Sequence, residues 1–220
     1  MKKFITSIFL LCICSISFAQ TGNGSLGLVR INGTVNFYNS VHYYNDNKNQ
    51  RNGTAGFSTE IGAKQFLGKS LFFLEETAGF VFSELPLPNY PFVVGVGGGD
   101  TYPLIDKGNE LGFLCSTVIG YQIPIKNNLS IDVFAGPDFR YLFKYNAKFG
   151  NLKQELPLYK ANLRLKAGAG LNIQNWNVSL FVSPDLLDRG KGYYRYSGDG
   201  TFRYRTIQVG FGITYYFKWN

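Results

Sequence analysis

The feature that most constrains this chain is an alternation of apolar and polar residues that recurs in eight separate segments. In the last of them, Ile207, Val209, Phe211, Ile213, Tyr215 and Phe217 alternate with Thr206, Gln208, Gly210, Gly212, Thr214 and Tyr216. A period of two, with many β-branched and aromatic residues, predicts β-strands. The predicted strands cover about 25–39, 54–67, 70–83, 111–125, 129–145, 160–174, 178–187 and 201–218.

The connections between these segments alternate in length. Residues 68–69, 126–128 and 175–177 have the length and the Gly/Asn chemistry of hairpin turns. The other connections are long, at about 40–53, 84–110, 146–159 and 188–200. This order predicts an all-β fold, an eight-stranded antiparallel up-and-down barrel with its short turns at one end, as in transmembrane barrels.

The first nineteen residues have the organisation of an export signal. Lys2 and Lys3 precede an apolar run over 4–18, and Ser17 and Ala19 stand at the positions that signal peptidase prefers. We therefore expect a cleaved signal peptide over 1–19 and one β-barrel domain over 20–220. Loss of the two lysines leaves 20 basic and 14 acidic residues, a net charge of +6.

Composition excludes other classes of protein. Charged residues make up 16% of the chain and aromatic residues 17%, which is unlike a disordered chain or a coiled coil. No apolar run after the signal approaches the length of a membrane helix. The exported product is therefore either a soluble protein or a membrane β-barrel.

The glycines indicate which face of the strands points outward. A soluble lipocalin-like barrel would turn its apolar face inward, whereas a membrane barrel turns it toward lipid. Ten strand glycines share the polar face, and only Gly27 and Gly33 lie opposite. An eight-stranded barrel has a narrow interior that cannot hold a large side chain at every position, so glycines on the polar face favour a polar interior. The ten are Gly56, Gly62, Gly79, Gly112, Gly120, Gly136, Gly168, Gly170, Gly210 and Gly212.

Aromatic residues near the strand ends predict two membrane-interface bands. One band belongs to the rim of the short turns and the other to the rim of the long loops. The predicted interface residues are Tyr141, Phe143, Tyr145, Trp176, Tyr193, Tyr194, Phe217 and Trp219.

The polar face predicts an ion-pair network in the lumen of the barrel. It carries five acids and five bases, and buried charges of both signs must pair. The residues are Arg30, Glu60, Lys64, Glu75, Asp132, Asp138, Arg140, Arg164, Lys166 and Asp185. We expect a plugged interior and no open pore. Glu76 falls on the lipid-facing side, so a β-bulge in the third strand, or an error in the phase assigned to that strand, is expected there.

Candidate chemical motifs are few. His42, the only histidine, lies near Ser40 and Asp46, residue types that a hydrolase or acyltransferase uses. The glycine-rich stretch 95–100 lacks the following helix that a phosphate-binding loop requires. The basic and aromatic stretch 189–205 fits lipopolysaccharide phosphates and an aromatic girdle better than nucleic acid. No cluster has metal-ligand spacing.

Three stretches carry a family resemblance: Ser17-Phe18-Ala19-Gln20, the strand over 178–186, and Ile213-Thr214-Tyr215-Tyr216-Phe217. With the eight alternating strands, they resemble the small outer-membrane β-barrel family of Bacteroidota, the porin-family or PorT-like barrels. The resemblance implies residence in a Gram-negative outer membrane and does not imply one activity.

These observations favour a non-catalytic role without a cofactor. The chain would be a membrane anchor, a surface-loop binding protein or a component of an envelope complex. Its expected partners are outer-membrane lipids, lipopolysaccharide and an envelope protein bound through the surface loops, and no nucleic acid. Two alternatives stay open: a lipid A-modifying acyl hydrolase or transferase that uses His42, and a narrow channel for ions or small solutes.

Overall fold

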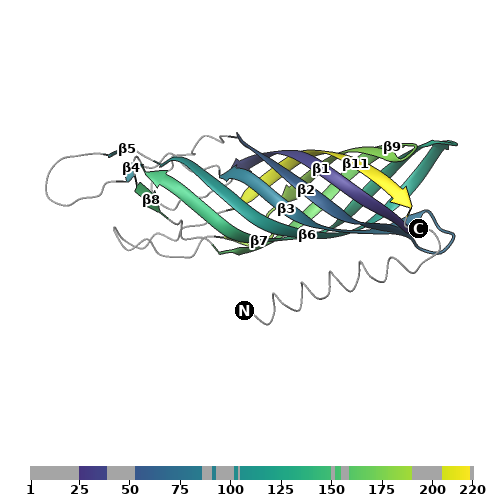
Figure 1. Ribbon diagram of the computed structural model, residues 1–220, viewed down its shortest axis with the longest axis horizontal. Coiled ribbons are helices and arrows are strands. Elements are labelled where there is room, and N and C mark those ends of the chain that lie inside the picture. The colour runs from purple at the N-terminus through teal and green to yellow at the C-terminus, as the bar shows by residue number, and fades with distance from the viewer. Residues whose placement is uncertain are drawn as a thin grey trace.

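The computed structural model shows an elongated β-barrel whose strands are strongly tilted against its long axis (Figure 1). Every regular element in the described residues is a β-strand. Within the same residues, no helix has the length and apolar composition needed to span a membrane. The structure describes residues 25–38, 53–85, 91–92, 102–103, 105–149, 152–154, 159–189 and 205–218 of the 220-residue chain.

Eight of the described strands form the barrel wall. They are β1 (Ser25–Tyr38), β2 (Gly53–Phe66), β3 (Phe72–Leu85), β6 (Ile105–Lys126), β7 (Leu129–Phe149), β9 (Ala161–Ile173), β10 (Trp176–Pro184) and β11 (Thr206–Lys218). Their order around the wall is β6-β3-β2-β1-β11-β10-β9-β7, every pairing is antiparallel, and β6 pairs with β7 to close the ring. The predicted eight-stranded up-and-down barrel is therefore confirmed.

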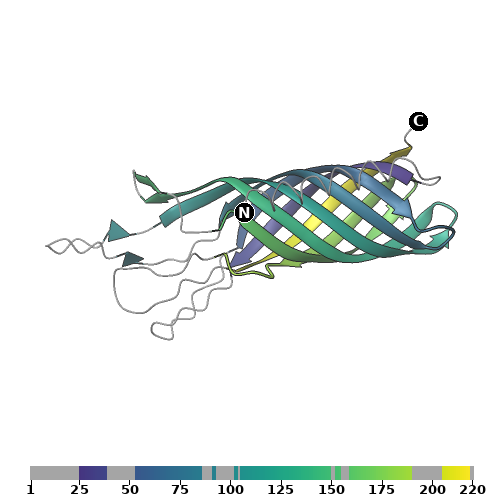
Figure 2. The ribbon, with the colours of Figure 1, turned by 90° about the horizontal axis from the view of Figure 1, so that it is seen from below.

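Three short strands lie beyond this wall. β4 (Pro91–Phe92) pairs with β5 (Tyr102–Pro103), and β8 (Leu152–Gln154) pairs with the end of β7. β6 and β7 are longer than predicted because their pairing continues outward as far as Ile105 and Phe149. The extended β6–β7 pair projects beyond the other strands on the side of the long connections (Figure 2).

The short turns at the opposite end occupy residues 67–71, 127–128 and 174–175. Gly68 and Gln174 have positive φ, at 64° and 55°. The amide of Leu67 donates to the carbonyl of Phe72 at 2.9 Å and closes the first turn. The third turn begins one residue before its predicted start. Gln174 adopts the left-handed backbone conformation, and Trp176 is already the first residue of β10.

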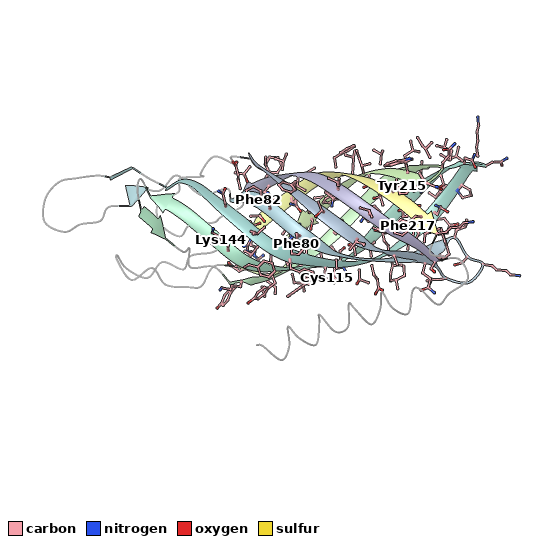
Figure 3. The ribbon with its side chains drawn as sticks, in the orientation of Figure 1. Phe80, Phe82, Cys115, Lys144, Tyr215 and Phe217 are labelled. Atoms are coloured by element: carbon pink, nitrogen blue, oxygen red, sulfur yellow. The ribbon has the colours of Figure 1, made fainter. Side chains whose placement is uncertain are left out.

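The apolar side chains of the wall face outward, as predicted. Ile31, Phe80, Ile119 and Leu180 are 61%, 58%, 59% and 64% exposed, whereas Thr214 on the opposite face is fully buried. In Figure 3 the labelled side chains of Phe80, Phe82, Tyr215 and Phe217 lie on the outside of the wall. The exterior is thus an apolar belt around a polar interior, the arrangement of a transmembrane barrel.

The inward glycines are required by close packing. A Cβ atom on Gly79 or Gly136 would lie 1.9 or 2.1 Å from a carbonyl oxygen of the neighbouring strand, and one on Gly120 would lie 2.2 Å from the ring of Phe73. A Cβ on the outward Gly33 would meet nothing within 4 Å. The bias of glycines toward the polar face therefore follows from the narrow interior.

The expected bulge at Glu76 is wrong, and so is the alternative of a phase error, because Glu75 and Thr77 are buried on either side of it. β3 pairs with both neighbours in a continuous register, in which Glu76 lies opposite Ala63 and Thr117. The register shifts lie between β6 and β7, and one of them falls between Leu111 and Gly112. Because β3 stays regular, Glu76 keeps its place on the outer face and is half-exposed.

Candidate functional site: the polar interior of the barrel

The structure places all ten predicted lumen residues in the interior, each buried. The alternation of the strands brings them there, since every second side chain of a strand points to the same face. Glu110 and Arg189 join them, and the buried charges among the described residues then comprise six acids and six bases. The interior charge is balanced, and these twelve residues occur in seven ion pairs within the described chain.

Near the short turns, Lys64 of β2 and Asp132 of β7 form the tightest pair. The Lys64 ammonium lies 2.6 Å from the Asp132 carboxylate and 4.0 Å from the ring centre of Phe73. Gln122 donates a hydrogen bond to the other Asp132 oxygen at 3.2 Å. The pair joins strands three positions apart in the wall order, so it reaches across the interior.

The middle of the interior is organised around Glu60 of β2. Its carboxylate accepts hydrogen bonds from Thr77 at 2.9 Å and from Asn32 at 2.5 Å. The Arg30 guanidinium lies 3.5 Å from Glu60 and 2.7 Å from Glu75. Glu60 therefore connects β2 with β1 and β3 and shares Arg30 with a second carboxylate.

Lys166 of β9 completes this group from the far wall. Its ammonium lies 3.6 Å from the Glu60 carboxylate and 4.8 Å from the ring centre of Phe181. β9 is four positions from β2 in either direction around the wall, so the two strands are diametrically opposite. The Glu60–Lys166 pair consequently spans the full width of the interior.

Toward the long connections, two arginines share one acceptor. Arg140 and Arg164 both donate to the side-chain oxygen of Gln208, with Arg164 at 3.2 Å. Asp138 lies 3.3 Å from Arg140, and Asp185 lies 3.0 Å from Arg164. These contacts tie β7, β9 and β11 together above the middle group.

The last pair was not predicted. Arg189, which follows β10, lies 3.1 Å from Glu110 of β6, and Ser83 donates to the same carboxylate at 2.7 Å. The backbone amide of Tyr159 donates a hydrogen bond to the carbonyl oxygen of Arg189 at 2.8 Å. The predicted fourth strand began at residue 111 and so missed Glu110, although Glu110 continues the even-numbered inward positions of that strand by one step toward the long connection.

This arrangement is suited to connecting strands rather than to acid–base or metal chemistry. In the described chain, each buried carboxylate lies within 4 Å of a buried cation, as the pairs above show. The described residues contain no group of three or more His, Cys, Asp or Glu residues that could hold a metal ion. His42 lies outside the described residues, as do Ser40 and Asp46.

The predicted interface aromatics are placed in part. Tyr141 and Phe143 contact each other near the long connections, with ring centres 6.0 Å apart. At the other end Trp176 packs on Tyr215 at 4.9 Å, and Phe217 is half-exposed (Figure 3). The register places Tyr145 opposite Glu110, and its side chain lies outside the described part, as do Tyr193, Tyr194 and Trp219.

No protein-family model matches the chain, and neither does any curated protein. Solved structures with a similar chain path include Ail, the attachment invasion locus protein of Yersinia pestis, at 12% identity and a TM-score of 0.44, covering 89% of this chain and all of that one. Neisserial surface protein A is 10% identical with a TM-score of 0.45, covering 88% and 99% of the two chains. The N-terminal β-barrel domain of Pseudomonas aeruginosa OprF is 12% identical with a TM-score of 0.33, covering 86% and 97%.

Proposed function

We propose that this chain is an integral outer-membrane β-barrel with a sealed lumen that acts as a non-catalytic anchor for its long connecting segments. The observation that carries the proposal is the set of interior pairs that span the barrel, above all Glu60–Lys166 at 3.6 Å and Lys64–Asp132 at 2.6 Å. Direct contacts across the full width of a narrow barrel occupy the path that a solute would follow. The same contacts speak against the narrow-channel alternative.

The membrane location is supported by the exterior. Closed barrels satisfy every backbone hydrogen bond without an exposed edge, which is what a hydrocarbon environment demands. The wall closes through β6 and β7 and exposes an apolar belt. The export signal over 1–19 is part of the proposal, as is a mature domain that begins at Gln20. So is membership of the Bacteroidota outer-membrane barrels that the sequence resembles.

The anchoring role is supported by how the interior fixes the bases of the long connections. The Asp185 carboxylate accepts hydrogen bonds from Asn162 at 2.7 Å and from the amide of Thr206 at 2.6 Å. Arg189 then reaches back to Glu110 on β6. A segment with both ends fixed to a rigid wall is a suitable platform for recognition, and functional residues often occur on such loops. Lipopolysaccharide and an envelope protein are the partners proposed for this end.

An epitope-insertion experiment tests the anchor and its orientation. One variant carries a short epitope within 39–52, which connect β1 to β2, and a matched variant carries it between Asn127 and Asn128. Antibody should label intact cells of the first variant only, and both variants after the outer membrane is permeabilised. Labelling of the second variant on intact cells, or recovery of both in the soluble fraction, would contradict the proposal. Heat-modifiable migration on a gel would show that each variant has folded.

A further inference from the structure

The rim formed by the short turns has an unusual charge distribution. In the part of the chain that the structure describes, the segments at this rim contain three lysines and no aspartate or glutamate, so the exposed charges of the rim are all basic. The long connections, by contrast, carry acids and bases together. These described segments are 25–28, 65–73, 122–129, 172–178 and 215–218, and their lysines are Lys69, Lys126 and Lys218.

All three lysines are exposed and come from different parts of the wall. Lys69 lies in the turn between β2 and β3, Lys126 ends β6, and Lys218 ends β11. Within the described residues none of them forms an ion pair, whereas every buried lysine of the interior has a carboxylate partner. The interior is electrically balanced, so these charges are not compensated from within the barrel.

Aromatic pairs at the same end mark the depth of the membrane interface. Phe72 packs on Tyr121 with ring centres 4.9 Å apart, and Trp176 packs on Tyr215 at the same separation. Aromatic side chains prefer the headgroup level of a bilayer. Lys69 precedes Phe72 by three residues and Lys218 follows Tyr215 by three, so both lie on the aqueous side of the rings.

We propose that this rim binds the phosphate groups of anionic glycerophospholipids, through a ring formed by Lys69, Lys126 and Lys218. A lysine extends a long apolar stem along a hydrophobic surface and keeps its ammonium at the headgroup level. An ammonium near an anionic membrane surface gains about 1 kcal/mol, which corresponds to about fivefold in affinity. The occupant is a phospholipid of the leaflet at the short turns, distinct from the lipopolysaccharide proposed at the long connections.

Native mass spectrometry of the full-length barrel with equimolar phosphatidylglycerol and phosphatidylcholine tests this proposal. The wild type should retain phosphatidylglycerol about fivefold over phosphatidylcholine for each lysine contact, and the variant K69Q/K126Q/K218Q should retain the two equally. The matched control K144Q/K160Q/R205Q changes three basic residues near the long connections and should keep the preference. Equal retention by the wild type would overturn the proposal, as would loss of the preference in the control alone.

Quenching of tryptophan fluorescence by brominated lipids tests the same proposal with a single substitution, in case the triple variant folds poorly. In a W219F background, Trp176 is the remaining tryptophan and lies near Lys218, since its strand partner Tyr215 is three residues away. Brominated phosphatidylglycerol should quench Trp176 more than brominated phosphatidylcholine, and K218Q should remove the difference. Equal quenching in the unmodified rim would refute the lysine ring, whereas quenching by neither lipid would show that the barrel itself had not inserted.

Discussion

Replacing Glu60 with glutamine should destabilise the barrel by about 2–3 kcal/mol, because it removes the carboxylate around which the middle of the interior is organised. Glutamine has nearly the same shape, and its amide oxygen can keep the hydrogen bond from Asn32 while its amide NH2 donates to the Thr77 hydroxyl, which accepts as well as donates. The change therefore removes the charge and largely keeps the packing. It leaves the Lys166 ammonium buried in the interior of the barrel without its anionic partner.

The magnitude follows from the geometry of the two cations. Removing one partner of a buried ion pair usually costs about 3–5 kcal/mol. Arg30 loses little stabilisation, because Glu75 remains as its ion-pair partner at 2.7 Å. Lys166 loses more stabilisation, because Glu60 is its carboxylate partner. The loss is moderated because the two charged groups are 3.6 Å apart and the ring of Phe181 still lies near the ammonium. The loss should consequently fall just below the usual range.

Urea unfolding of the barrel in lipid vesicles, followed by tryptophan fluorescence and gel migration, would measure this loss. K166M and the double variant E60Q/K166M complete a double-mutant cycle, with an expected coupling of about 1–2 kcal/mol. Coupling near zero, or an E60Q variant as stable as the wild type, would refute the claim that this pair joins opposite walls.

Three further predictions concern the wall and its ends. L180R should cost about 2–4 kcal/mol in vesicles and I125R, at the rim, about 1 kcal/mol or less, because the cost of a lipid-facing arginine falls from the midplane to the interface. G136A should lower the urea midpoint through a collision with the next strand, at about 1–3 kcal/mol, whereas G33A, with open space around its Cβ, should leave it unchanged or raise it. R189Q should leave the barrel folded while proteolysis of the β10–β11 connection speeds up several-fold, and cleavage at the wild-type rate would show that Arg189 does not fix this connection.

Much of the fold was predictable because it depends on a period of two. A strand side chain that faces inward fixes the facing of its neighbours two residues away, so the inward positions of Arg30, Arg164 and Lys166 could be predicted without any structure. Closure follows from the same pattern, since open edges are not tolerated in lipid. The glycine bias gave the direction of the apolar face, because only one face of such a barrel is crowded.

Which acid pairs with which base in the interior could not be predicted from the sequence. Whether Lys166 meets Glu60 or another acid depends on strand tilt and register, which alternation leaves undetermined. Glu110 was missed because the pairing of β6 with β7 continues past the barrel wall, and Arg189 was missed because it follows the last residue of a strand. The expected bulge at Glu76 failed because continuous pairing on both edges holds β3 in register despite one unfavourable outward position.

The sealed interior is the central claim, and planar-bilayer recording tests it most directly. The wild-type barrel, inserted at an ionic strength that supports porin currents, should give no discrete conductance steps. The variant E60A/K166A, which shortens both side chains of the pair that spans the interior, serves as the matched comparison under the same conditions. Reproducible steps from the folded wild-type protein would contradict the account and would favour a narrow channel.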